Sequence, residues 1–305
     1  GACALLGIPL LQHPENLGFG DWDLFLGKLE GARRTILLYG QFPWWDPWTR
    51  GGFPLAANPQ CGVFGVAMPL ALLFGTTVGM RLATLVGFAL ATEGARRLAR
   101  LWLDDPWASA AAGLIYGLNG GVLATAVVGY HVTMCYPVLP WMLYCLFQLD
   151  RGPRYAVGLG FWMAYNVLNG IQYFTVYQVL IGVVVGLRLL ALRRGEPRRR
   201  LLVHGTLALG VFLALARSRI ALCLGVMRDF PREIEPYLGE TFWSLLVDLL
   251  RRPSLARARE APSLFWETTC YVGPIVLALV GASVLRGWRW WHWLALLSLW
   301  LAVGG

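Results

Sequence analysis

The run from Tyr155 to Leu192, YAVGLGFWMAYNVLNGIQYFTVYQVLIGVVVGLRLLAL, decides the fold. A transmembrane helix needs about 20 predominantly apolar residues, so this run is too long for a single membrane span. Its middle carries Asn169-Gly170, a residue pair typical of turns. The run therefore predicts a helical hairpin. The turn that follows the hairpin is densely basic and holds Arg193, Arg194, Arg198, Arg199 and Arg200.

The composition of the whole chain favours a membrane protein. Its 305 residues are 57% hydrophobic and 14% charged, and the mean hydropathy is +0.56. Soluble domains are about 45–50% apolar and about 25% charged. These values argue against a soluble enzyme and against a nucleic-acid-binding domain. They predict an all-α fold, a polytopic bundle of transmembrane helices, with residues 1–305 forming one transmembrane domain.

Other apolar runs extend the pattern to about nine spans. The runs at the two ends, Gly1–Leu11 and Trp290–Gly305, are too short to be complete spans, so we expect the first and last spans to be cut and the chain to be a piece of a longer protein. The remaining spans are predicted near Thr76–Leu98, Trp107–Val128, Val132–Leu149, Leu201–Ala216 and Tyr271–Leu285.

The net charge of +9 marks topology rather than a polyanion partner. If every span crosses once, the basic turns 96–106, 150–154, 193–200 and 286–289 fall on one side, which the positive-inside rule makes the cytoplasm. The long polar regions 13–60 and 217–269 then lie on the extracytoplasmic face and carry short helices. We therefore expect the lipid bilayer to be a partner of this chain, and we do not expect nucleic acid to be one.

The six cysteines predict no metal or redox site, because no two of them have the spacing of a ligand or dithiol pair. Buried inert thiols are the favoured interpretation, with a Cys223–Cys270 disulfide as the alternative.

The first polar region carries Gly20-Asp21-Trp22-Asp23. Two carboxylates at this spacing can hold a divalent cation such as Mg²⁺ or Mn²⁺, or one of them can act as a general base toward a hydroxyl group. The alternative is structural, because Asp23 precedes a helix predicted near 24–39 and can cap it. A loop of defined shape follows at 40–60, and its candidate scaffold residues are Trp45, Asp46, Pro47, Asn58 and Gln60.

This arrangement of GDWD, a helix and then GQFPWWDPWTRGGFPLAANPQ at 40–60 resembles YfhO-like bacterial polytopic membrane proteins and the related GT-C-type glycosyltransferases. The resemblance extends more diffusely over nearly the whole chain, including Asn119-Gly120-Gly121, Gly129-Tyr130-His131 and the stretch from Glu267 to Gly273. It departs from the family pattern at Asp46, where asparagine is common.

The resemblance implies an enzyme of the bacterial inner membrane that transfers a sugar from a polyprenyl-phosphate donor to a glycan, lipid or protein acceptor on the outer face. The catalytic base of that family corresponds to Asp21 or Asp23, which also become the candidate ligands of a divalent cation. A leaving lipid phosphate needs cationic stabilisation near the outer membrane surface. The candidates for binding it are His131, Arg219, Arg228 and Arg232, and the resemblance adds Glu267.

Two other functions remain open from the sequence. One is a transporter or flippase for lipid-linked material, although the acidic residues collect in loops rather than at midplane positions. The other is a non-catalytic subunit of a larger membrane complex.

Overall fold

The computed structural model describes residues 12, 22–49, 51–127, 134–170, 172–229, 274–290 and 292–293. Within these ranges the regular secondary structure is helical, with no β-strand; a single bridge pairs Asp46 with Phe53. The prediction of an all-α fold is confirmed to that extent. The helices are α2 (Trp22–Tyr39), α3 (Ala67–Phe74), α4 (Thr76–Ala99), α5 (Pro106–Gly117), α6 (Gly120–Val127), α7 (Val138–Phe147), η2 (Leu149–Arg151), α8 (Pro153–Leu168), α9 (Gln172–Leu192), α10 (Glu196–Asp229) and α14 (Pro274–Leu285).

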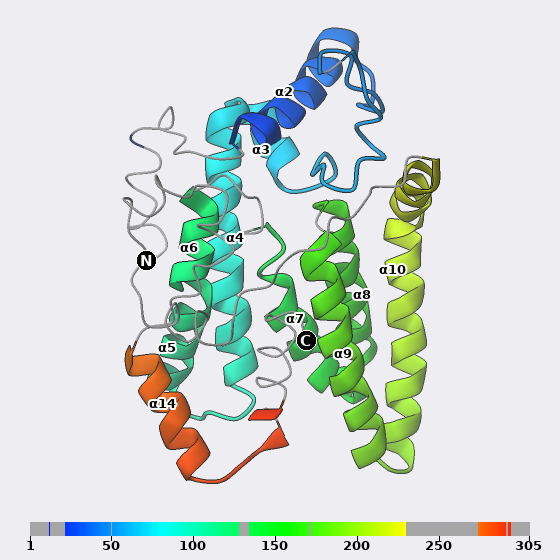
Figure 1. Ribbon diagram of the computed structural model, residues 1–305. Helices are drawn as coiled ribbons and strands as arrows, with labels where there is room; N and C mark the ends of the chain where they lie inside the picture. Colours follow the sequence, from blue (N-terminus) through cyan, green and yellow to red (C-terminus); the bar gives the residue numbers. More distant parts are fainter. Residues whose placement is uncertain are drawn as a thin grey trace.

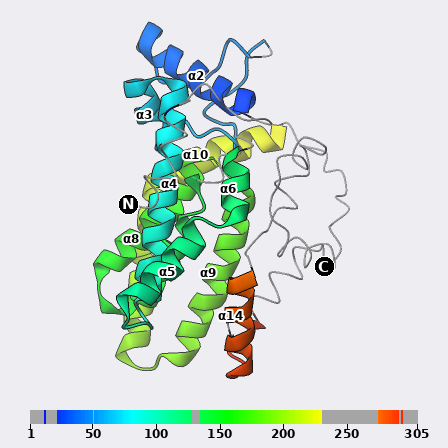
Figure 2. The ribbon, with the colours of Figure 1, turned by 90° about the vertical axis from the view of Figure 1, so that its left-hand side faces the viewer.

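The long helices α4, α8, α9 and α10 run roughly alongside one another, and α2 lies across one end of this bundle (Figures 1 and 2). One apolar core lies beneath α2, where residues of α2, α3 and α4 enclose Leu55 and Cys61. A second core lies between α7, α8, α9 and α10 around Val138 and Leu149. The first core positions the loop 40–66 on the bundle.

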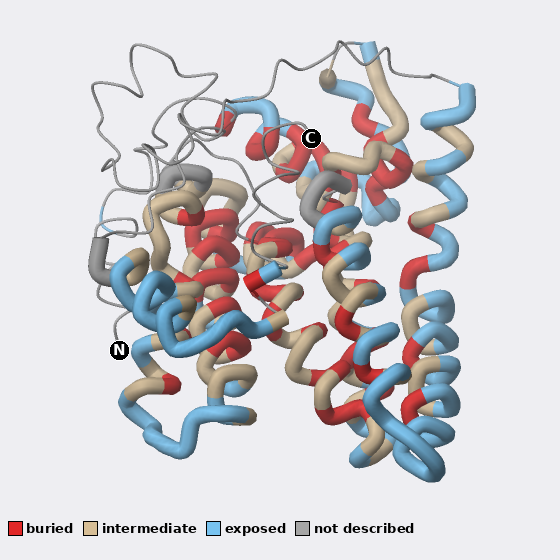
Figure 3. The backbone as a smooth tube through the Cα atoms, turned by 60° about the horizontal axis from the view of Figure 1, so that its bottom comes forward, coloured by how far each residue is buried: buried red, intermediate tan, exposed pale blue. Residues whose placement is uncertain are grey.

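The predicted hairpin is present. Helix α8 ends at Leu168, α9 begins at Gln172, and between them Gly170 has φ +79°, a conformation that favours glycine. The α9 segment Thr175–Leu192 and helix α10 are the two described helices that are long and apolar enough to cross a membrane. Only 17% of the most apolar window of each is buried, so both helices expose most of that apolar surface. Figure 3 shows their buried residues on the inward side and exposed ones on the outward side.

All four basic turns lie at the same end of the bundle, the lower end in Figure 1, as the sequence predicted. Three contacts join the turns or the helix ends beside them. Arg193 forms an ion pair with Asp150 at 3.4 Å, and the Arg188 guanidinium lies 4.8 Å from the centre of the Trp290 ring. Trp102 packs edge-on against Phe147. Helix α2 and the loop 40–60 lie at the opposite end (Figure 1).

Three predicted spans differ from the observed helices. The run near Trp107–Val128 is divided into α5 and α6, because Asn119 accepts a hydrogen bond from the Val122 amide through Oδ1 and so begins a new helix. The helix within the run Val132–Leu149 begins only at Val138, directly after Pro137. The span near Leu201–Ala216 belongs to a helix of 34 residues, which continues to Asp229 and makes the start of the region 217–269 helical.

Candidate functional site

The loop 40–66, which includes the loop predicted at 40–60, is built around the buried carboxylate of Asp46. This side chain has no exposed surface, and it accepts hydrogen bonds from the Trp48 amide at 2.9 Å and the Thr49 hydroxyl at 2.6 Å. Its backbone pairs with Phe53 in both directions. The carboxylate also lies against α2, where a Cβ added at Gly31 would come within 3.1 Å of it. Asp46 thus fixes the shape of the loop and its position on α2.

The other residues predicted to shape this loop have different roles. Trp45 is half exposed, and its indole lies over Gly52, whose φ of +104° again favours glycine. Pro47 is exposed beside Asp46. Asn58 accepts a hydrogen bond from the Gln60 amide at 2.9 Å, which turns the chain toward Cys61.

Arg219 of α10 holds the end of this loop. Its Nη2 atom donates to the carbonyl oxygens of Asn58 and Cys61, both at 2.6 Å, and its guanidinium lies 5.2 Å from the centre of the Phe64 ring. The side chain is 1% exposed, yet Nε and Nη1 find no hydrogen-bond partner in the described part of the chain. A buried cation with unused donors is costly unless an anion or further acceptors meet it. Arg219 is therefore both a clamp on the loop and a candidate anion-binding group.

The hairpin turn between α8 and α9 packs against the same loop through glycines. A Cβ at Gly62 would meet the Asn169 carbonyl oxygen at 3.2 Å, and one at Gly65 would collide with the Asn169 side chain. A Cβ at Gly170 would collide with the backbone of Cys61. The absence of side chains at these three positions lets the loop and the turn approach each other at backbone distance.

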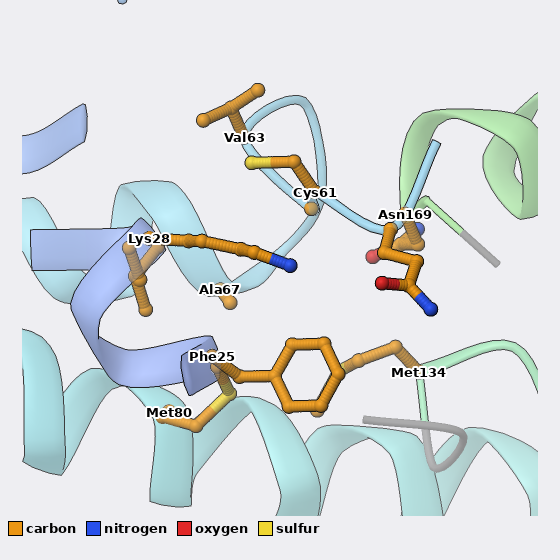
Figure 4. Close-up of a pocket in the computed structure, with 11 residues that line it drawn as sticks. Phe25, Lys28, Cys61, Val63, Ala67, Met80, Met134 and Asn169 are labelled. Carbon is orange, nitrogen blue, oxygen red and sulfur yellow. The ribbon is translucent and has the colours of Figure 1, made fainter. Parts of the chain in front are cut away.

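A pocket lies where α2, this loop and the hairpin turn meet (Figure 4). Its volume is about 20 Å³, which is room for about one water molecule. Apolar residues form most of the lining, while Gln60 and Asn169 contribute polar groups. The ammonium group of Lys28 points between Cys61 and Phe25 toward Asn169 (Figure 4). Burial raises the pKa of the Cys61 thiol to about 11, so this thiol is protonated and unreactive near neutral pH.

Two further cations are buried at this end of the bundle. Lys28, the only lysine of the chain, is 7% exposed. Arg81 of α4 is 3% exposed, and its guanidinium lies 4.4 Å from the centre of the Trp22 ring. The patterns in the sequence did not mark Lys28, Cys61 or Asn169 as candidate site residues. The signal that could have identified Lys28 is its singularity in a chain whose other basic residues are all arginine.

The other candidates of the sequence analysis lie away from the pocket or outside the described residues. Asp23 is exposed on α2 and does not line the pocket. Arg228 is exposed and forms an ion pair with Asp229 at 3.2 Å. The described residues contain no group of three or more His, Cys, Asp or Glu that could hold a metal ion. The candidates that lie outside the described residues are Asp21, His131, Arg232 and Glu267.

The comparisons with known proteins add no relative. No family model matches the chain, and no curated protein or solved structure does.

Proposed function

We propose that this chain is a membrane glycosyltransferase of the GT-C type, and that Arg219 binds the phosphate of a polyprenyl-phosphate sugar donor. The observation that carries the proposal is the buried Arg219 guanidinium with two unused donors, held beneath the loop 40–66. In this proposal the chain crosses the bacterial inner membrane about nine times, with its basic turns in the cytoplasm.

The depth of Arg219 along α10 supports this role. Arg219 follows Arg200 by 19 positions, which corresponds to about 29 Å along a helix at about 1.5 Å per residue. The hydrocarbon core of a bilayer is about 30 Å thick. If Arg200 lies at the cytoplasmic surface, Arg219 lies at the outer surface. That is the level of the phosphate of a lipid-linked donor whose sugar faces outward.

The proposed reaction is a direct displacement at the anomeric carbon of the donor sugar. The oxygen of an acceptor hydroxyl bonds to this carbon while the bond from the carbon to the phosphate oxygen breaks, and its electron pair leaves with the polyprenyl phosphate. The hydroxyl proton passes to a carboxylate. Arg219 stabilises the charge on the departing phosphate.

Of the two candidates, Asp21 and Asp23, we assign the carboxylate to Asp21, because Asp23 is exposed on α2. Asp21 directly precedes α2, the helix that carries Lys28.

A test uses the purified full-length protein and a labelled polyprenyl-phosphate sugar. We expect transfer by the wild type, loss of turnover in Asp21→Asn with folding intact, and a decrease of about 100-fold or more in Arg219→Gln. Arg219→Lys retains a cation, and Arg217→Gln removes an exposed arginine from the same helix as a control. Unchanged turnover in Asp21→Asn, Asp23→Asn and the double variant would disprove the catalytic assignment.

A transporter for lipid-linked material is the second candidate, because two features of the bundle are typical of transporters. One is the interruption between α5 and α6. The other is a buried polar network in which the Asn166 amide donates to Gln178 at 2.5 Å and the Gln178 amide donates to the Cys135 carbonyl at 3.0 Å. Movement of the labelled lipid across vesicles without transfer of its sugar would favour this function.

A further inference from the structure

We propose that the turn between α9 and α10 is a binding site for the headgroup of an anionic phospholipid. This turn joins the two described helices that are long and apolar enough to cross a membrane. It lies at the end of the bundle opposite Arg219, so the proposal does not depend on the proposed glycosyltransferase activity (Figure 1).

The charge of the turn exceeds what its own acids can neutralise. Residues 193–200 contain five arginines and a single acid, Glu196. Glu196 forms ion pairs with Arg200 at 3.1 Å and Arg199 at 3.7 Å. Arg193 pairs with Asp150 of the neighbouring turn at 3.4 Å. Arg194 and Arg198 remain, and no carboxylate of the described chain forms an ion pair with either of them.

The surroundings of these two arginines indicate a lipid rather than a nucleic acid or an acidic protein. All residues from 191 to 200 are exposed. Large apolar side chains flank the arginines on both helices: Leu187 is 61% exposed on α9, and Val203 is 58% exposed on α10. Cations that follow lipid-facing apolar residues are typical of a membrane–water interface, where the stems of arginine side chains pack on the acyl region and the guanidinium groups meet phosphates.

Neighbouring elements enlarge the same surface. Arg151 in η2 and Arg154 at the start of α8 are exposed, and the Arg193–Asp150 ion pair holds their turn against the α9–α10 turn. The Trp290 ring lies under the Arg188 guanidinium, and the nearby Trp288 is 55% exposed. Tryptophan at the level of the headgroups is characteristic of interfacial anchoring. A zwitterionic lipid has no net charge to offset Arg194 and Arg198, whereas phosphatidylglycerol does.

The test compares binding of phosphatidylglycerol and phosphatidylcholine to the purified full-length chain in neutral detergent, measured by native mass spectrometry. The wild type should prefer phosphatidylglycerol. Arg198→Gln should weaken phosphatidylglycerol binding by about five-fold and Arg194→Gln/Arg198→Gln by about 25-fold, because each arginine near an anionic surface contributes about a factor of five. Binding of phosphatidylcholine should be unchanged, and Arg198→Lys should retain the preference.

Arg217→Gln is the matched control, since Arg217 is also exposed on α10 but 19 positions farther along the helix. It should leave the preference within about two-fold of the wild type. Equal affinity of the wild type for the two lipids would overturn the proposal. So would an Arg217→Gln effect as large as that of Arg198→Gln, because the preference would then follow total charge and not this turn.

Discussion

Arg219 and Cys61 are 158 positions apart in the sequence, and a 2.6 Å hydrogen bond from Nη2 to the Cys61 carbonyl oxygen joins them. The same nitrogen donates to the Asn58 carbonyl oxygen. One side chain of α10 thus fixes the end of the loop 40–66, which also receives the turn between α8 and α9. The stability of this junction and the proposed anion site depend on the same guanidinium.

Arg219→Gln should destabilise the protein by about 2–4 kcal/mol, because two buried carbonyl groups lose a charged donor. Arg217→Gln, two positions away on the exposed side of α10, should change stability by no more than about 0.5 kcal/mol. Thermal unfolding in detergent, followed by tryptophan fluorescence, measures both variants. Equal effects of the two substitutions would contradict the clamp role of Arg219.

Substitutions at two glycines with positive φ distinguish the stability cost of backbone strain from the cost of close packing. Gly195 has φ +62°, and a Cβ added there would meet nothing within 4 Å, so Gly195→Ala should cost only about 1–2 kcal/mol of backbone strain. Gly170 has φ +79°, and a Cβ there collides with the backbone of Cys61. Gly170→Ala should therefore cost clearly more than Gly195→Ala in the same unfolding measurement. A cost no larger than that of Gly195→Ala would show that the loop and the hairpin turn do not approach so closely.

The parts of the fold that the sequence predicted are those encoded locally. The hairpin followed from the length of the apolar run and from Asn169-Gly170, and the common end of the basic turns followed from the positions of the arginines. The interruption at Asn119 was also encoded locally, in Asn119-Gly120-Gly121. It was missed because the apolar character of the surrounding run outweighed the turn signal.

The candidate site was less predictable because its contacts are distant in sequence. Arg219 was selected for its charge, but neither its position within a continuous helix nor its two carbonyl partners could be read from neighbouring residues. Asp46 was selected as a loop residue, and its burial depends on Gly31 of α2. Lys28 was passed over because a single lysine on a predicted helix gives no periodic signal.

The carboxylate of Glu30 should make stability depend on acidic pH. Burial alone would raise its pKa, but hydrogen bonds from Thr76 and Arg34 and the charges of Arg33 and Arg34 lower the pKa below its usual value. A group whose pKa is lower in the folded state contributes stability above its unfolded pKa of about 4.3 and loses it as the pH falls through the folded value. Unfolding measured from about pH 6 to about pH 3 should show this loss.

Two variants test the origin of that pH dependence. Glu30→Gln should weaken it, because the side chain no longer titrates. Thr76→Val should weaken it as well, because removing the hydroxyl donor brings the pKa of Glu30 nearer to its unfolded value. A pH dependence identical to that of the wild type in both variants would exclude Glu30 as its source.

Two glycines four positions apart on α2 test whether Asp46 fixes the loop to that helix. A Cβ at Gly27 meets nothing within 4 Å, so Gly27→Ala should stabilise the protein by about 0.5–1 kcal/mol through helix propensity. A Cβ at Gly31 comes within 3.1 Å of the Asp46 carboxylate, which its hydrogen bonds to Trp48 and Thr49 hold in place. For Gly31→Ala the cost of overpacking should exceed the gain in helix propensity, so we expect this variant to destabilise the protein by about 1–3 kcal/mol. If Gly31→Ala raised the unfolding temperature as much as Gly27→Ala, the carboxylate could not be seated against α2.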